Sequence, residues 1–215
     1  MTFPEPPRVF IFDFGGVVFR WRPADLLARV LPRQVRNAAE AAHWQQAFFQ
    51  GYGGDWGAFD AGLIDADQLC ERISRRTGLR PEDVQAVVDA VPDELQAIPD
   101  TVALVHALRA QGHRLLFLSN MPLPFARHLR QHQPVLQAFE DGVFSSEVRC
   151  AKPDPAIFHL ACRQFGLQPA QAWFIDDHPA NIEVAQGLGF RAWAFNEAAP
   201  LAAALRAQGL LLPAA

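Results

Sequence analysis

Lysine is scarce in this 215-residue sequence: of 19 Lys and Arg residues, only Lys152 is a lysine. The arginines are spread along the chain rather than gathered in basic blocks, and the formal net charge at pH 7 is -4. A mildly acidic chain without a basic cluster lacks the attraction to phosphate backbones on which nucleic-acid binding depends. We therefore expect no nucleic-acid partner.

Cysteines and long apolar segments are also scarce. The cysteines Cys70, Cys150 and Cys162 are odd in number and lack the spacing of metal ligands, which favours a reducing, cytoplasmic setting. The apolar run over residues 9–19 is interrupted by Asp13 and is too short to span a bilayer. The first eight residues hold prolines and a glutamate, where a signal peptide needs a basic start and an apolar stretch. We therefore expect no membrane partner.

Half of the residues are apolar, which is enough to bury a core and argues against disorder. Short apolar runs typical of strands buried on both faces of a parallel sheet span residues 8–19, 113–119, 172–175 and 190–195. Segments with helical periodicity span residues 99–111, 154–165, 179–188 and 198–208. This alternation predicts an α/β fold with a Rossmann-like, mostly parallel sheet.

The segment between the first strand and the rest of this pattern is different in character. Amphipathic stretches without an intervening strand run cover residues 23–31, 35–50, 66–77 and 81–91. We therefore predict a core formed by residues 1–19 and 99–215, with a helical cap formed by residues 20–98. A glycine-rich stretch at residues 51–57 is expected to be a turn between cap helices. A sharper hypothesis places Trp56 or Tyr52 of this stretch against the ring of a sugar substrate.

Polar residues follow the predicted strands at their carboxyl ends, where open α/β sheets bind ligands. They are Asp13, Ser119-Asn120 and Asp176-Asp177, and Lys152 joins them from a position just ahead of a predicted helix. Each could alone be a helix cap or a surface residue. Together, however, several carboxylates at one edge favour a hard cation such as Mg²⁺ between them. A hydroxyl, backbone amides and one ammonium beside that cation are suited to a phosphate, and a carboxylate can attack a bound phosphoryl group.

These residues stand in four ordered segments: Asp13-Phe14-Gly15-Gly16-Val17, Leu118-Ser119-Asn120, Lys152-Pro153 and Ile175-Asp176-Asp177. The set resembles the four motifs of the haloacid dehalogenase-like (HAD) superfamily, over nearly the whole chain. The helical insert is similar to the C1 cap of subfamily I. Within that family the sequence most resembles the bacterial α-D-glucose-1-phosphate phosphatase branch. The resemblance implies a Mg²⁺-dependent phosphatase acting on a small phosphorylated metabolite, with a sugar phosphate as the expected substrate.

The resemblance also implies a role for each acidic position. Asp13 matches the nucleophile, which forms an aspartyl-phosphate, and it matches a metal ligand. Gly15 matches the position whose backbone carbonyl binds Mg²⁺. Asp177 matches the principal acidic ligand of the last motif, and Asp176 matches its supporting neighbour.

The remaining motif residues match the positions that bind phosphate. Ser119 and its neighbour Asn120 stand at the phosphate-binding position of the second motif. Lys152 matches the lysine that contacts both the nucleophile and the phosphate. His178 lies beside the last motif, where we expect it to cap a helix.

One position departs from the phosphatase pattern. Phosphatases of this superfamily commonly carry a second aspartate two residues after the nucleophile as general acid and base, and here that position is Gly15. The glucose-1-phosphate phosphatase branch also has glycine there. The acid could be replaced by a water, by a cap residue such as Asp55, or by a leaving group that needs little protonation. Two alternative functions stay open: a 2-haloacid dehalogenase, and a catalytically weak relative that binds a sugar phosphate.

Overall fold

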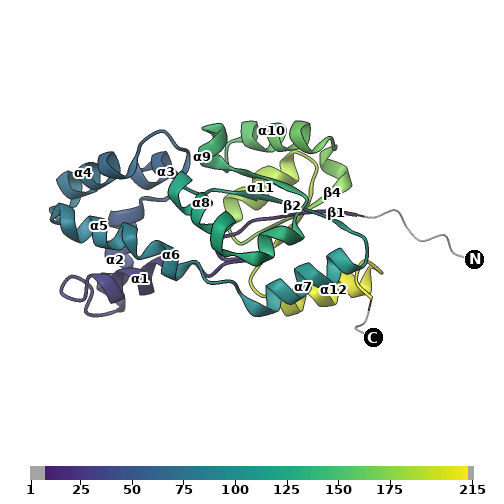
Figure 1. Cartoon of the computed structure of the whole chain (residues 1–215), viewed down its shortest axis with the longest axis horizontal. Coiled ribbons are helices and arrows are strands. Elements are labelled where there is room, and N and C mark those ends of the chain that lie inside the picture. The colour runs from purple at the N-terminus through teal and green to yellow at the C-terminus, as the bar shows by residue number, and fades with distance from the viewer. Residues whose placement is uncertain (1–7, 213–215) are drawn as a thin grey trace, which may run out of the picture.

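A computed structural model describes residues 8–212, with the exception of the side chain of Tyr52. It has an α/β fold built on a five-stranded parallel sheet with the strand order β3-β2-β1-β4-β5 (Figure 1). The strands are β1 (Val9–Phe12), β2 (Arg114–Ser119), β3 (Asp141–Phe144), β4 (Ala172–Asp176) and β5 (Arg191–Ala194). The first strand lies at the centre, hydrogen-bonded to β2 on one side and β4 on the other. Its carboxyl end is therefore next to the ends of two other strands.

Both faces of the sheet are covered, as the apolar runs predict. Phe10 and Phe12 of β1 point into one apolar cluster and Ile11 points into the other, because successive side chains of a strand alternate between faces. Helices α7 (Pro99–Ala110) and α12 (Ala198–Ala207) contribute to the first cluster. Helices α10 (Pro155–Phe165) and α11 (Pro179–Gly187) contribute to the second. Figure 1 shows these two helix layers on opposite sides of the sheet.

The first strand is shorter than the apolar run that predicts it. It ends at Phe12, and Gly16 then adopts a positive φ of 75°, which lets the chain turn back. The carbonyl of Phe14 accepts hydrogen bonds from the backbone N–H groups of Val18 and Phe19, at 2.9 and 2.8 Å. The expected strand over residues 8–19 is therefore wrong beyond Phe12, because this turn leaves Asp13 at the strand end.

The segment after this turn is helical and lies to one side of the sheet (Figure 1). It holds α1 (Pro23–Val30), α2 (Ala38–Phe49), η1 (Gly51–Gly53), α3 (Asp55–Asp60), α4 (Ala66–Thr77), α5 (Pro81–Asp89) and α6 (Val91–Glu94). The stretches of chain that enter and leave this helical segment lie next to each other. The backbone N–H of Arg20 donates to the Gln96 carbonyl at 2.8 Å, and that of Ile98 donates to the Val18 carbonyl at 2.9 Å. We propose that these crossings bound the cap expected over residues 20–98.

Two elements of the core have no counterpart in the expected pattern. Strand β3 pairs with β2 at the edge of the sheet, and α8 (Leu123–His132) follows β2. Strand β3 has only four residues and begins with Asp141 and Gly142, so it presents no apolar run. The short elements η2 (Pro134–Ala138), α9 (Ser145–Val148) and η3 (Pro169–Gln171) complete this part of the chain.

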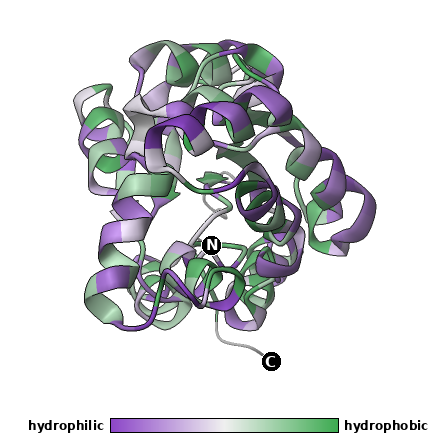
Figure 2. Ribbon diagram, turned by 90° about the vertical axis from the view of Figure 1, so that its left-hand side faces the viewer, coloured by the Kyte–Doolittle hydropathy of each residue, from purple (hydrophilic) through white to green (hydrophobic). Residues whose placement is uncertain are grey.

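No helix in residues 8–212 is both long enough and apolar enough to cross a membrane. Figure 2, which views the molecule from the side of the cap helices, shows hydrophilic residues recurring along the helices. This is the pattern of helices that pack one face against a core and expose the other to water.

Candidate active site

The ammonium group of Lys152 lies between two carboxylates at the end of the central strands. Its Nζ is 2.9 Å from Oδ1 of Asp13, directly after β1, and 2.6 Å from Oδ2 of Asp176, the last residue of β4. Lys152 is 1% exposed and Asp176 is fully buried. Burial alone lowers the pKa of Lys152, but the two carboxylates outweigh it and raise that pKa, so the ammonium stays charged.

Asp176 is held by donors on several sides. Besides Lys152, the backbone N–H of His178 donates to its Oδ1 at 2.8 Å. The Asn181 side-chain amide lies 2.9 and 3.0 Å from its two oxygens. Because both oxygens already accept hydrogen bonds within the protein, Asp176 is placed to hold Lys152 against Asp13.

Asp177 completes a group of three carboxylates. Asp13, Asp176 and Asp177 each offer an oxygen, and these atoms all lie within 4.8 Å of one another. Burial raises the pKa of Asp13 to about 7, the nearby charge of Lys152 opposes this shift, and the charges of Asp176 and Asp177 add to it. The protein thus concentrates more negative charge here than its single lysine neutralises.

The donor set fits a magnesium ion. Carboxylate and carbonyl oxygens are the ligands that Mg²⁺ prefers, and a divalent cation relieves the repulsion among the three acids. The backbone leaves room for Asp177 to reach the others: a Cβ at Gly16 would lie 2.2 Å from Oδ2 of Asp177. Gly15, the expected carbonyl ligand, lines the same cavity as Asp13 and Asp177.

The second predicted segment divides into two different positions. Asn120 lines the cavity, and its side chain forms two 2.8 Å hydrogen bonds with the backbone of Lys152, one to the carbonyl and one from the N–H. It therefore fixes the loop that carries the lysine. Ser119 is fully buried, its Oγ donates to the Asn120 carbonyl at 3.4 Å, and it is not among the described lining residues.

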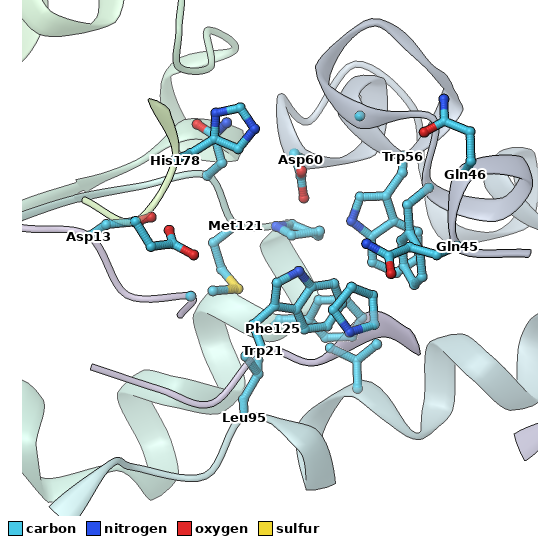
Figure 3. Close-up of a pocket in the computed structure, with 18 residues that line it drawn as sticks. Asp13, Trp21, Gln45, Gln46, Trp56, Asp60, Leu95, Met121, Phe125 and His178 are labelled. Carbon is cyan, nitrogen blue, oxygen red and sulfur yellow. The ribbon is translucent and has the colours of Figure 1, made fainter. Parts of the chain in front are cut away.

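A cavity of about 310 Å³ opens in front of Asp13. Figure 3 shows aromatic and aliphatic side chains on much of its wall, with Asp13 and His178 on one side. The apolar lining residues are Trp21, Pro23, Phe49, Trp56, Val91, Leu95, Met121, Pro122 and Phe125. Gln45 and Gln46 of α2 are the uncharged polar side chains that the described part of the cap places on this wall. The site thus combines the charged residues at the sheet edge with a largely apolar cavity, called here the apolar chamber.

The cap residues that reach the site differ in part from those expected. Trp56 does line the cavity, but it belongs to α3, which begins at Asp55 because the Gln50 side chain accepts a 3.2 Å hydrogen bond from the Asp55 N–H. The expected turn over residues 51–57 is therefore wrong from Asp55 onward. Asp55 pairs with Arg76 at 3.0 Å and is not among the described lining residues, whereas Asp60 is. The side chain of Tyr52 lies outside the described part of the structure.

His178 takes the capping position expected of it and also faces the cavity. Its Nδ1 accepts a 3.3 Å hydrogen bond from the Ala180 N–H at the start of α11. It lines the cavity beside Asp177. No sequence pattern pointed to Asp60 or to the apolar wall, because both depend on how the cap packs over the sheet edge.

A family model for haloacid dehalogenase-like hydrolases matches residues 7–189. The chain belongs to this family of hydrolases. A sesquiterpene phosphatase from Aspergillus oryzae, astK, is 26% identical over 183 residues, which cover 85% of this chain and 86% of that protein. An (S)-2-haloacid dehalogenase from Burkholderia cepacia, 4A, is 22% identical over 191 residues, which cover 85% of this chain and 80% of that protein. The protein is thus a HAD-like hydrolase with both phosphatases and dehalogenases among its relatives.

Solved structures agree with the fold. A HAD family enzyme from Bacteroides thetaiotaomicron, crystallised with magnesium and inorganic phosphate, superposes with a TM-score of 0.67 at 23% identity. The match covers 87% of this chain and 93% of the other. The expected α/β fold with a Rossmann-like parallel sheet is therefore confirmed.

Proposed function

We propose that this HAD-like hydrolase is a Mg²⁺-dependent phosphatase that cleaves a small phosphomonoester through an aspartyl-phosphate on Asp13. The observation that carries the proposal is the cluster of Asp13, Asp176 and Asp177 around the buried ammonium of Lys152. A nucleophilic carboxylate beside a buried cation and a hard-metal site is suited to phosphoryl transfer, in which the protein chiefly positions groups and stabilises negative charge.

Each side chain has a distinct part in this chemistry. A carboxylate oxygen of Asp13 attacks phosphorus, and the bond from phosphorus to the substrate oxygen breaks. Lys152 stabilises the negative charge on the transferring group, while Asp176 keeps its ammonium in place. Asp13, Asp177 and the Gly15 carbonyl would hold Mg²⁺, which supplies Lewis-acid stabilisation of the phosphoryl oxygens when bound. Water then hydrolyses the aspartyl-phosphate.

The cavity wall favours a substrate whose organic part is apolar. Trp21, Phe49, Trp56 and Phe125 offer large apolar surfaces, whereas a sugar needs many hydrogen-bond partners that only a few lining groups can supply. The similarity to a sesquiterpene phosphatase points the same way. We therefore propose aryl or hydrocarbon phosphates as the substrate class, in preference to the sugar phosphate that the sequence resemblance implies.

The dehalogenase relatives make 2-haloacids the second candidate class. A 2-haloacid carries a carboxylate that needs a cationic partner in the site. No lysine or arginine is among the described residues that line the cavity, whereas the three acids beside it fit the metal ion that a phosphate group needs. The charge of the lining therefore favours the phosphatase.

The test is hydrolysis of 4-nitrophenyl phosphate with Mg²⁺, with EDTA and by the variant Asp13→Asn. We expect Mg²⁺-dependent release of 4-nitrophenolate, lost in EDTA and reduced by at least about 10³-fold in the variant, because the nucleophile is removed. Halide release from a 2-haloacid without metal would support the dehalogenase instead. Binding of phosphate esters without turnover of either probe would support the third alternative, a catalytically weak protein that binds such ligands.

A further inference from the structure

The cavity holds an acidic side chain that the proposed reaction has not yet used. Gly15 stands where related phosphatases carry their acid, so the leaving oxygen has no proton donor from that position. Of the described lining residues that the cap contributes, Asp60 is the ionisable one. Building on the proposed function, we propose that Asp60 is the general acid that protonates the leaving oxygen and the general base that activates the hydrolytic water.

The position of Asp60 is fixed from the core as well as from the cap. The backbone N–H of Met121 donates to Oγ of Ser145 at 2.9 Å, and that hydroxyl donates to the Asp60 carbonyl at 2.5 Å. Met121 follows Asn120 in the second motif and also lines the cavity. One buried serine therefore connects the second motif to the end of α3, and α3 carries the carboxyl over the site.

The side chain of Asp60 points into the cavity between Asp13 and Trp56 (Figure 3). Trp56, one turn earlier on α3, lines the same cavity. A protonated carboxyl offers both an O–H donor and an acceptor oxygen to the space it faces. The residue is thus oriented by the cap and directed at the space above the nucleophile.

The surroundings raise the pKa of this carboxyl toward the neutral range. Burial raises the pKa of Asp60 to about 8, and the charge of Asp13 adds to the shift, while the charge of Lys152 opposes it. Asp177 and His178 face the same cavity from the core. A pKa near the working pH is what acid–base catalysis requires, since the group must both give and take a proton.

Asp60 gives up a proton in the first step and takes one back in the second. As Asp13 attacks, the electron pair of the bond between phosphorus and oxygen moves to the leaving oxygen, which takes the proton of Asp60 and departs as an alcohol. A water then attacks the phosphorus of the aspartyl-phosphate and gives a proton to the Asp60 carboxylate. This releases phosphate, regenerates Asp13 and returns Asp60 to its acid form.

The experiment compares two substrates with one ring but different leaving groups. Benzyl phosphate releases a poor leaving group that needs a proton, whereas 4-nitrophenyl phosphate releases a stable anion. For Asp60→Asn we expect kcat/KM to fall about 10²–10⁴-fold with benzyl phosphate and less than about 10-fold with 4-nitrophenyl phosphate. The variant should also show a burst of one 4-nitrophenolate per site, because it lacks the base for hydrolysis of the intermediate.

The matched control is Asp55→Asn, which removes an acid from the same helix but one that pairs with Arg76 away from the cavity. It should affect both substrates equally and show no burst. An equal loss on both substrates in Asp60→Asn, or none, would overturn the role of Asp60 while the phosphatase stands. A wild-type protein that releases no 4-nitrophenolate with Mg²⁺ would instead refute the proposed function itself.

Discussion

Replacing Lys152 by arginine tests whether the site needs a compact cation or only a positive charge. The substitution leaves the formal net charge at -4, and the chain already uses arginine at its other 18 basic positions. On an exposed surface this exchange would change activity and stability very little. Lys152, however, is 1% exposed, so the protein encloses the side chain that the substitution enlarges.

The size of the effect follows from how tightly the ammonium is held. Its nitrogen lies 2.9 Å from Asp13, 2.6 Å from Asp176 and 5.6 Å from the centre of the Phe174 ring. A guanidinium is longer and planar and must push these groups apart. Overpacking of this kind costs about 1–3 kcal/mol, and displacing one contact to the transferring group costs about 10²–10³ in rate.

Two measurements check the reasoning for Lys152→Arg. The kcat/KM for 4-nitrophenyl phosphate with Mg²⁺ should fall about 10²–10³-fold. The Tm should fall by about 2–12 °C, since 1 kcal/mol corresponds to about 2–4 °C in a domain of this size. Lys152→Met separates the effect of the charge from the effect of side-chain volume. Methionine has a side chain of similar length, but it leaves Asp13 and Asp176 without a cation. If Lys152→Arg retained nearly normal activity and Tm, Lys152 would have no catalytic part and the assignment of the site would be wrong.

Two further predictions concern the metal site and the cap acid. Gly16→Ala should lower the apparent Mg²⁺ affinity about 10–100-fold, because its Cβ displaces Asp177; Gly78→Ala, with a similar φ of 76° but nothing within 4 Å, controls for backbone strain and should bind Mg²⁺ normally. In metal-free buffer, Asp60→Asn should have a higher free energy of unfolding than the wild type, and this gain should grow from pH 4 to pH 8. The folded wild type binds more protons than the unfolded chain in that window, so its stability falls as pH rises. Urea titrations at pH 5 and 8.5 should differ by at least about 1 kcal/mol in this gain, and equal gains would contradict the raised pKa of Asp60.

Local chemistry is enough to predict much of this fold from the sequence. Helix α7 was expected over residues 99–111 and spans Pro99–Ala110, because a proline starts it and Gly112 follows it. The ends of β1 and β4 bring Asp13 and the Asp176-Asp177 pair to one edge, since parallel strands share their carboxyl ends, and the loop before α10 brings Lys152 to them. The strand-and-helix pattern predicts this shared edge for the three acids, although it does not give the order of the strands.

Features that depend on packing between distant segments could not be predicted from the sequence. Strand β3 takes its structure from pairing with β2, and its four residues have no apolar pattern of their own. Asp60 reaches the site through Ser145, which is 85 residues away in the sequence. The sequence leaves a water, a cap residue such as Asp55 and an undemanding leaving group as alternatives for the missing acid, and the structure places the end of α3 at the cavity rather than its start. Only the docking of the cap on the core distinguishes these two aspartates.

The division of residues between core and cap has a chemical consequence. In the proposed mechanism the core supplies the nucleophile Asp13, the cation Lys152 and the metal carboxylates, all of which act on the phosphoryl group whatever it is attached to. The cap supplies the apolar wall and Asp60, which in the same proposal act on the organic part and on the oxygen that joins it to phosphorus. A proton donor in the cap reaches that oxygen only while α3 is seated on Ser145. Substrate fit and proton delivery therefore depend on the same contact, so a ligand that fails to fill the apolar chamber loses acid catalysis along with binding energy.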